Sequence, residues 1–345
     1  SVKKINEEKM SNLENIAKQM VTPGKGILAA DESSGTIKKR FDTINVESTE
    51  ENRRDYREIL FQTKNAMENY ISGVILFDET IRQKSKNGPT LVEVISNAGS
   101  LPGIKVDTGA KDLAFNSNEK VTEGLDGLRE RLIEYYNLGA KFAKWRAVIT
   151  IESSIPSDLC INANAHALAR YAALCQENEI VPIVEPEVLM DGAHTIDRCY
   201  EVTKRTLEVV FSELVAHGVN LKGICLKPNM VIDGTLVTDK SSPKTIAEKT
   251  ISCFKEVVPE DVPGIVFLSG GQSEIEATEN LDQMNKIGNL PWNLSFSYGR
   301  ALQASALQAW SGKVENEETA SMAFNHRAEM NSLATLGKWD AGLEK

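Results

Sequence analysis

Cysteine is scarce in this 345-residue chain, and long apolar runs are missing. The five cysteines stand alone, with no CxxC pair and no dense spacing, at positions 160, 175, 199, 225 and 253. We therefore expect reduced, structural thiols and a reducing compartment. No run approaches the ~18 apolar residues of a membrane span. The N-terminal stretch "SVKKINEEKM" has no apolar core of a signal peptide, so the sequence predicts a cytoplasmic protein that binds no membrane.

Positive charge is also in deficit. Lys and Arg total 39 against 49 Asp and Glu, which gives a net charge of −10. This balance argues against nucleic acid or a membrane surface as partner, although one pocket can still be positive enough for a small anion. Neither a GxGxxG stretch nor a phosphate-binding P-loop occurs, since "TPGKG" at 22–26 lacks the required spacing and hydroxyl residue.

Histidine is equally sparse. The four histidines, at 166, 194, 217 and 326, form no HxH or HxxxH pair. The sequence therefore predicts no metal site and no cofactor. His166 and His217 fall in helical patterns, which is typical of ordinary surface or core histidines.

What the chain does contain is a strand pattern that repeats eight times, each repeat followed by a helical pattern. The strand segments are 26–31, 73–78, 103–107, 142–148, 180–187, 223–227, 264–271 and 293–299. Five begin with glycine, which suits a tight turn out of the preceding helix. Eight alternations favour an α/β fold whose parallel sheet closes into a barrel.

We predict one (β/α)8 barrel domain over residues 1–345. Extra helices are expected at about 7–20 and 316–331, with about 332–345 as a C-terminal tail. Within the barrel, 49–71 reads as one helix with a capping box of Ser48 and Glu51. Ser242-Pro243 is expected to open another helix, and 122–138 is read as helical.

Charged residues end most of the strand segments. In a (β/α)8 barrel these ends carry the active site. Side chains two apart on a strand share a face, so each charged pair points the same way. Any one of these charged residues, taken alone, could simply be exposed to solvent at the rim of the barrel. Many charged side chains that point into the same space, however, must form ion pairs or bind a ligand. They are Asp31, Lys105, Asp107, Lys144, Arg146, Glu185, Glu187, Lys227 and Arg300.

Lys227 is the predicted nucleophile. It follows the apolar run Gly223–Leu226 directly, where a charge is costly to bury. Burial and neighbouring cations lower the pKa of a lysine, and a free amine attacks carbonyls to form a Schiff base. The alternative is a lysine that snorkels from a strand end or pairs with Glu185.

Two other segments predict anion binding. "LSGGQ" and "SYGRA" follow strand segments seven and eight, a common phosphate site of barrels, and supply Ser269, Gly270, Gly271, Ser297, Gly299 and Arg300. "DESSGTIKKR" adds Ser33, Thr36, Lys39 and Arg40. Plain strand-to-helix turns are the alternative. Two anion sites around a reactive lysine suggest a bisphosphate.

These blocks, in this order, closely resemble class I fructose-bisphosphate aldolase, from about residue 10 to 330. The motifs are "GKGILAADES", "AKWRAV", "PIVEPE", "CLKPNMV", "LSGGQ" and "LSFSYGRALQ". The resemblance implies a metal-independent lyase of glycolysis and gluconeogenesis, which cleaves fructose 1,6-bisphosphate reversibly to dihydroxyacetone phosphate and glyceraldehyde 3-phosphate.

The resemblance also implies roles. Lys227 would form the imine, Glu185 would carry protons with Glu187 beside it, Asp31 would take the C4 hydroxyl proton, and Lys144 would assist by charge. Ser269, Gly270, Gly271, Ser297 and Arg300 would hold one phosphate. Ser33, Thr36, Arg40, Lys105, Lys39 and Arg146 would serve the other end. The chain ends without the terminal tyrosine of many eukaryotic members. Either the given chain is trimmed, or enamine protonation is handled otherwise, for example by water and Glu185.

The family expectation for assembly is a homotetramer. Another Schiff-base barrel, such as a transaldolase or a deoxyribose-phosphate aldolase, is the enzymatic alternative, but it would not need two phosphate sites. Because members of the family also bind cytoskeletal proteins, a scaffold with partner binding is the non-enzymatic alternative.

Overall fold

The computed structural model describes residues 2–345; Ser1, the first residue of the predicted domain, lies outside them. Within this range, eight parallel strands form a closed barrel in the order β1-β10-β9-β8-β7-β6-β3-β2. The predicted (β/α)8 barrel is thus confirmed. Its strands are β1 (Gly26–Ala30), β2 (Ile71–Leu76), β3 (Leu101–Lys105), β6 (Phe142–Ile149), β7 (Val181–Val188), β8 (Cys225–Leu226), β9 (Gly264–Phe267) and β10 (Asn293–Tyr298).

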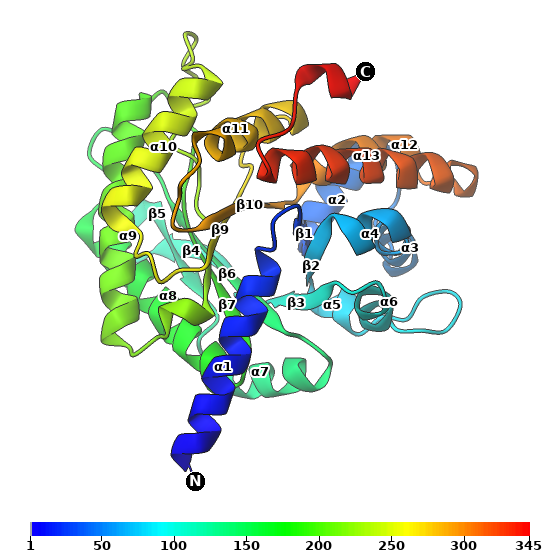
Figure 1. Cartoon of the computed structure of the whole chain (residues 1–345), viewed down its shortest axis with the longest axis horizontal. Helices are drawn as coiled ribbons and strands as arrows, with labels where there is room; N and C mark the ends of the chain where they lie inside the picture. Colours follow the sequence, from blue (N-terminus) through cyan, green and yellow to red (C-terminus); the bar gives the residue numbers. More distant parts are fainter. Residues whose placement is uncertain (1) are drawn as a thin grey trace.

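Helices surround the barrel (Figure 1). They are α2 (Ser34–Asp42), α3 (Glu50–Phe61), α4 (Lys64–Asn69), α5 (Asp78–Ile81), α6 (Leu91–Asn97), α7 (Leu128–Asn137), α8 (Asp158–Glu177), α9 (Ile196–Ala216), α10 (Pro243–Val257), α11 (Glu274–Ile287) and α12 (Arg300–Trp310). Ser242 caps α10 as predicted, because its side chain accepts a hydrogen bond from Thr245 N–H.

The helix predicted over 49–71 is two helices. Thr63 interrupts it: the Thr63 hydroxyl donates to Ile59 C=O, a local bond that competes with the helical pattern. The N-cap is Thr49, which accepts from Asn52 N–H, and not the predicted Ser48. The helix predicted over 122–138 begins only at Leu128, because its first residues belong to a hairpin of β4 (Gly109–Leu113) and β5 (Asn116–Glu123) and to the turn that follows it.

Two glycines that were predicted to begin strands, Gly73 and Gly103, lie inside β2 and β3 and have a different purpose from the one predicted. Gly73 and Gly103 lie in extended backbone, and a Cβ on either would meet the Phe142 ring at 2.8 and 2.4 Å. They make room for a phenylalanine that is fully buried inside the barrel. The large side chain on β6 therefore requires residues without a side chain at the facing positions of β2 and β3.

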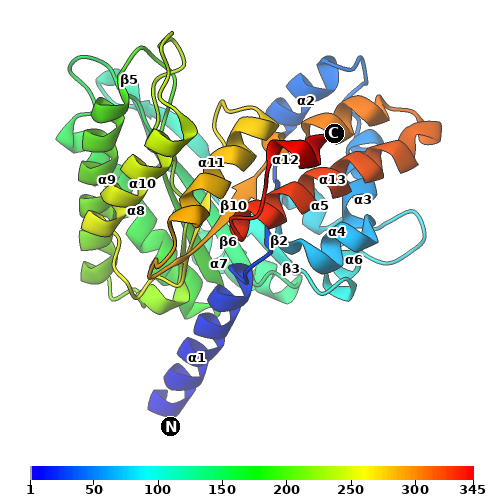
Figure 2. The same cartoon turned by 45° about the horizontal axis from the view of Figure 1, so that its top comes forward.

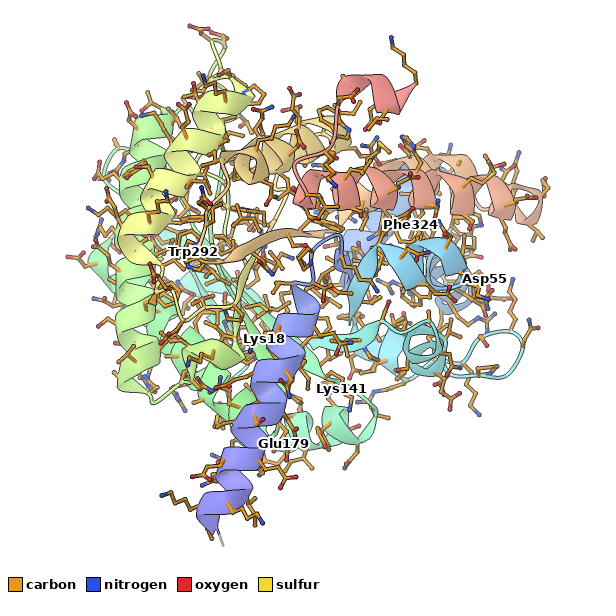
Figure 3. All side chains as sticks on the ribbon, viewed as in Figure 1. Lys18, Asp55, Lys141, Glu179, Trp292 and Phe324 are labelled. Atoms are coloured by element: carbon orange, nitrogen blue, oxygen red, sulfur yellow. The ribbon has the colours of Figure 1, made fainter. Side chains whose placement is uncertain are left out.

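Two further helices flank the barrel. α1 (Val2–Met20) packs Leu13, Ala17 and Met20 against the barrel interior, and its N-terminal turns extend away from the body (Figure 2). At the other end, α13 (Glu317–Thr335) packs against α3 and α4, with Phe324 fully buried (Figure 3).

The predicted tail 332–345 begins within α13. Beyond it, Trp339 is buried, and Glu344 accepts hydrogen bonds from Arg327, His326 and Trp339. The segment is therefore held against the body at Trp339 and Glu344, although most of its other residues beyond α13 are exposed. Within residues 2–345, no helix combines the length and apolar character needed to cross a membrane.

Candidate active site

Lys227 stands where β8 ends, and backbone hydrogen bonds explain its position. Its N–H donates to Val184 C=O (2.8 Å), which continues the ladder between β7 and β8. Pro228 has no N–H, so the strand cannot continue in the same way. Asn229 is buried and bridges the next turn, accepting from Val188 N–H and donating to Thr203. The ladder therefore places Lys227 level with Glu185 on the neighbouring strand.

Lys227 and Glu185 form a buried pair. Lys227 Nζ lies 3.6 Å from Glu185 Oε1, and the two side chains are only 6% and 3% exposed. Burial is the main cause of the lowered pKa of Lys227, and the cation of Lys144 lowers it further. Burial likewise raises the pKa of Glu185. Both directions favour the uncharged amine and the protonated carboxylic acid, which are a nucleophile and a proton donor side by side.

Lys144 has the opposite electrostatic balance. Burial would lower its pKa, but Asp31 and Glu185 raise it, so Lys144 remains a cation. Its Nζ lies 2.8 Å from Asp31 Oδ2. For Asp31, burial acts to raise the pKa, but Lys144 and Lys227 lower it to about 2. Asp31 is therefore a carboxylate at neutral pH and can accept a proton.

A second ion pair lies beside Glu185, on strands β6 and β7. Arg146 Nε lies 2.7 Å from Glu187 Oε1 and 3.8 Å from Glu185 Oε2. Asp107 Oδ2 accepts from Arg146 N–H at 3.0 Å, and Asp107 Oδ1 lies 3.9 Å from Lys105 Nζ. The Asp107 carboxylate therefore ties the segment after β3 to β6.

One cavity of about 640 Å³ at the carboxyl ends of the strands brings these residues together. Its lining contains every residue that was given a catalytic or phosphate-binding role except Lys39, namely Asp31, Ser33, Thr36, Arg40, Lys105, Lys144, Arg146, Glu185, Glu187, Lys227, Ser269, Gly270, Gly271, Ser297, Gly299 and Arg300. Lys39 is exposed on α2 instead. A larger groove of about 960 Å³ lies over α3 and α5, but several of its charged side chains are already paired, as Glu79 is with Arg53 and Arg82 is with Asp78.

Comparison with known proteins decides the family. A family model described as fructose-bisphosphate aldolase class-I matches residues 12–345. The chain belongs to the class I fructose-bisphosphate aldolase family. Members are glycolytic lyases, and the activity is the reversible aldol cleavage of fructose 1,6-bisphosphate.

Similar relatives come from bacteria, plants and a parasite. A probable class 1 aldolase of Xanthomonas campestris pv. campestris is 56% identical over 96% of this chain and 99% of its own. The cytosolic aldolase 4 of Arabidopsis thaliana is 56% identical over 93% of this chain and 82% of its own. The aldolase of Plasmodium falciparum, solved with TRAP and a small-molecule inhibitor, is 50% identical with a TM-score of 0.96, over 97% of each chain.

The glycine turn after β9 of this aldolase is shaped for an anion. Gly270 has φ of +57°, a left-handed conformation that glycine adopts readily and that occurs in anion-binding turns. Gly271 N–H donates to the Met190 sulfur at 3.0 Å. Thioether sulfur is a weak acceptor, so an anionic oxygen would readily replace it.

Two more donors face this turn. Arg300 donates to Gly270 C=O at 2.9 Å, and both burial and the nearby Arg40 lower its pKa. The strand order places β1 beside β10, which explains why Arg40 and Arg300 adjoin. The Ser297 hydroxyl is buried and makes no hydrogen bond within the described residues. An anion would supply the acceptor that it lacks.

Sequence reasoning missed the support beneath Arg40. Glu32 Oε2 accepts from Arg40 (2.6 Å) and from Gln303 (3.1 Å), while Arg57 donates to Glu32 C=O. Tyr56 OH in turn donates to Gln303 Oε1 at 2.9 Å. The only sequence signal was a second acid directly after Asp31. Met190 was also missed, because its contact with the glycine turn depends on how the loop after β7 folds.

Proposed function

We propose that Lys227 is the nucleophile of this aldolase and that it forms a Schiff base with C2 of the ketose phosphate. One observation carries the proposal: a fully buried lysine with a lowered pKa lies 3.6 Å from a carboxyl group with a raised pKa. The neutral amine adds to the carbonyl carbon, and the carbonyl oxygen takes up a proton. Glu185 is placed to give that proton and to help the hydroxyl leave as water, with Glu187 beside it.

Bond cleavage follows from the charge of the iminium. Asp31 accepts the proton of the C4 hydroxyl, the C3–C4 electron pair flows into the iminium, and glyceraldehyde 3-phosphate leaves. Lys144 keeps Asp31 anionic until that proton arrives and repels a proton from Lys227. The remaining enamine is then protonated at C3, and water releases dihydroxyacetone phosphate and restores the amine.

The two phosphates bind at the rim of the cavity. Ser269, Gly270, Gly271, Ser297, Gly299 and Arg300 hold the phosphate nearer the imine. Ser33, Thr36, Arg40, Lys105 and Arg146 serve the other end, with Lys39 contributing only if α2 moves. Cavity size supports this assignment, because about 640 Å³ suits a small sugar bisphosphate.

We extend the proposal to the organisation of the protein. Residues 1–345 act as one barrel domain, located in the cytoplasm, and assemble as a homotetramer. The cytosolic naming of the Arabidopsis relative supports this location. The Plasmodium relative was crystallised with TRAP, which supports a second role in partner binding for this chain, with cytoskeletal proteins as the class to test.

Borohydride trapping tests the central claim. The enzyme is incubated with dihydroxyacetone phosphate and EDTA, reduced, and read by intact mass and peptide mapping. We expect one adduct per chain, on Lys227, and none in Lys227→Met. An adduct on Lys144 or Lys105 would overturn the assignment, and a folded, ligand-binding enzyme with no adduct would sink the Schiff-base mechanism.

A further inference from the structure

A second cluster of chemically capable side chains lies outside the barrel mouth. His166 is on α8, Glu213 is in the last turn of α9, and His217 directly follows that helix. The two helices pack side by side (Figures 1 and 2). Although the sequence predicted that the histidines are scattered, helix packing brings two of them together, with ring centroids 5.2 Å apart.

The spacing of their ligand atoms suits a single cation. Glu213 Oε2 lies 3.6 Å from His166 Nδ1, and one ligand atom from each of the three residues falls within 4.8 Å of the others. Two ligands about 2.1 Å from a tetrahedral zinc ion lie about 3.4 Å apart. Small rotamer changes of these solvent-accessible side chains therefore suffice to close the cluster around an ion.

A backbone carbonyl fixes the tautomer of His217. Its Nδ1 lies 2.8 Å from Glu213 C=O, and because a carbonyl only accepts, Nδ1 carries the proton. The lone pair of the neutral ring is then on Nε2. Metal-binding histidines commonly donate their second ring nitrogen to a backbone carbonyl in this way, which fixes the tautomer.

We propose that His166, Glu213 and His217 bind one divalent transition-metal cation of the zinc type. Two imidazoles and a carboxylate are the donors that zinc accepts, whereas magnesium and calcium prefer all-oxygen sites. The side chains are 53%, 33% and 25% exposed, so the ion enters from solvent and water completes its coordination. This site is separate from the aldol chemistry.

Neighbouring charges both oppose and favour cation binding at this site. Arg170 lies one helical turn after His166 and lines the shallow cavities that His166 and His217 border, so its charge opposes a cation. Asp126 lines the same two cavities and offsets it. All five cysteines are buried in the described part of the chain, so no exposed thiol there competes for the ion.

Isothermal titration of EDTA-treated, desalted enzyme with zinc chloride tests the site. We expect one ion per chain, with affinity at least tenfold weaker in His166→Gln and in Glu213→Gln. The matched control is His326→Gln, a histidine that instead pairs with Glu344 and should keep wild-type zinc binding. Aldol cleavage should be unchanged in all three variants, and circular dichroism should show that they are folded.

Three results would overturn the proposal. The first is the absence of saturable binding to the wild-type enzyme at one ion per chain. Equal weakening in His326→Gln would show that zinc binds histidines unspecifically. Undiminished binding in both His166→Gln and Glu213→Gln would show that the two residues serve only as a helix-to-helix ion pair.

Discussion

Two buried lysines, Lys144 and Lys227, share the carboxyl group of Glu185. Glu185 Oε1 lies 3.9 Å from Lys144 Nζ and 3.6 Å from Lys227 Nζ. The difference between the lysines is Asp31, which lies 2.8 Å from Lys144 Nζ. With a carboxylate of its own, Lys144 has a raised pKa, whereas the pKa of Lys227 is lowered. One lysine therefore supplies fixed charge, and the other supplies the neutral amine.

Lys144→Met should make Lys227 harder to deprotonate. The substitution removes a cation that lowers the pKa of Lys227 and frees Glu185 and Asp31 to attract its proton. The pKa of Lys227 then rises, so a smaller fraction is neutral at any given pH. We expect the rate of covalent trapping with dihydroxyacetone phosphate to show its acidic limb about one pH unit higher. Lys141→Met, outside the cavity, is the control, and an unshifted limb in Lys144→Met would contradict the charge argument.

Asp31→Asn should stop bond cleavage while sparing imine chemistry. Asparagine keeps the size of the side chain but cannot accept the C4 hydroxyl proton, and loss of a general base typically costs roughly 10²–10⁴ in rate. Trapping on Lys227 should persist, as should exchange of the C3 proton of dihydroxyacetone phosphate. Asp78→Asn is the matched control, since Asp78 also follows a strand but pairs with Arg82 outside the cavity. If proton exchange disappeared together with cleavage in a folded enzyme, the role given to Asp31 would be wrong.

Strand periodicity explains why most of this site could be predicted. Lys144 with Arg146, and Glu185 with Glu187, are two residues apart on strands, so local geometry alone sends each pair to one face. Strand-helix alternation then puts all strand ends on one side. By contrast, Glu32 forms an ion pair with Arg40 and accepts a hydrogen bond from Gln303, which is 271 residues away in the sequence. Such contacts depend on how helices pack, which no local pattern encodes.

Dependence on tertiary packing also explains which parts of the fold were predicted wrongly. The hairpin of β4 and β5 is rich in polar residues, including the buried Glu119 and Thr122 of β5, so it lacks the apolar alternation that marks a strand. Thr63 divides a continuous helical pattern through one side-chain hydrogen bond. His166, Glu213 and His217 meet because α8 and α9 pack together, although 47 residues separate the first two.

Met190→Leu should improve phosphate binding slightly. Leucine has a similar volume but no acceptor for Gly271 N–H, so the bound phosphate no longer replaces an existing hydrogen bond. Because a neutral hydrogen bond contributes about 0.5–1.5 kcal/mol net and sulfur lies at the weak end, we expect inhibition by inorganic phosphate to strengthen by about two- to threefold. Turnover at saturating substrate should not change. The exposed Met322→Leu on α13 is the control, and weaker phosphate inhibition in Met190→Leu would show that the sulfur supports the site.

Lys227→Met should abolish trapping and make the protein more stable at neutral pH. A lysine whose pKa is lower in the folded state binds fewer protons there than in the unfolded chain, so its burial destabilises the fold at pH values below the folded pKa. As pH rises from the folded pKa toward the ordinary lysine value of 10.5, this destabilisation disappears. Methionine carries no charge, so calorimetry should give a Tm higher by about 2 °C at pH 7, with the difference shrinking at pH 9.5.

Lys141→Met, which replaces an exposed lysine, should show no such pH-dependent gain. A Lys227→Met variant that melts well below the wild type at pH 7 would mean that the amine stabilises the fold through Glu185, and the nucleophile would then have to be charged in the free enzyme.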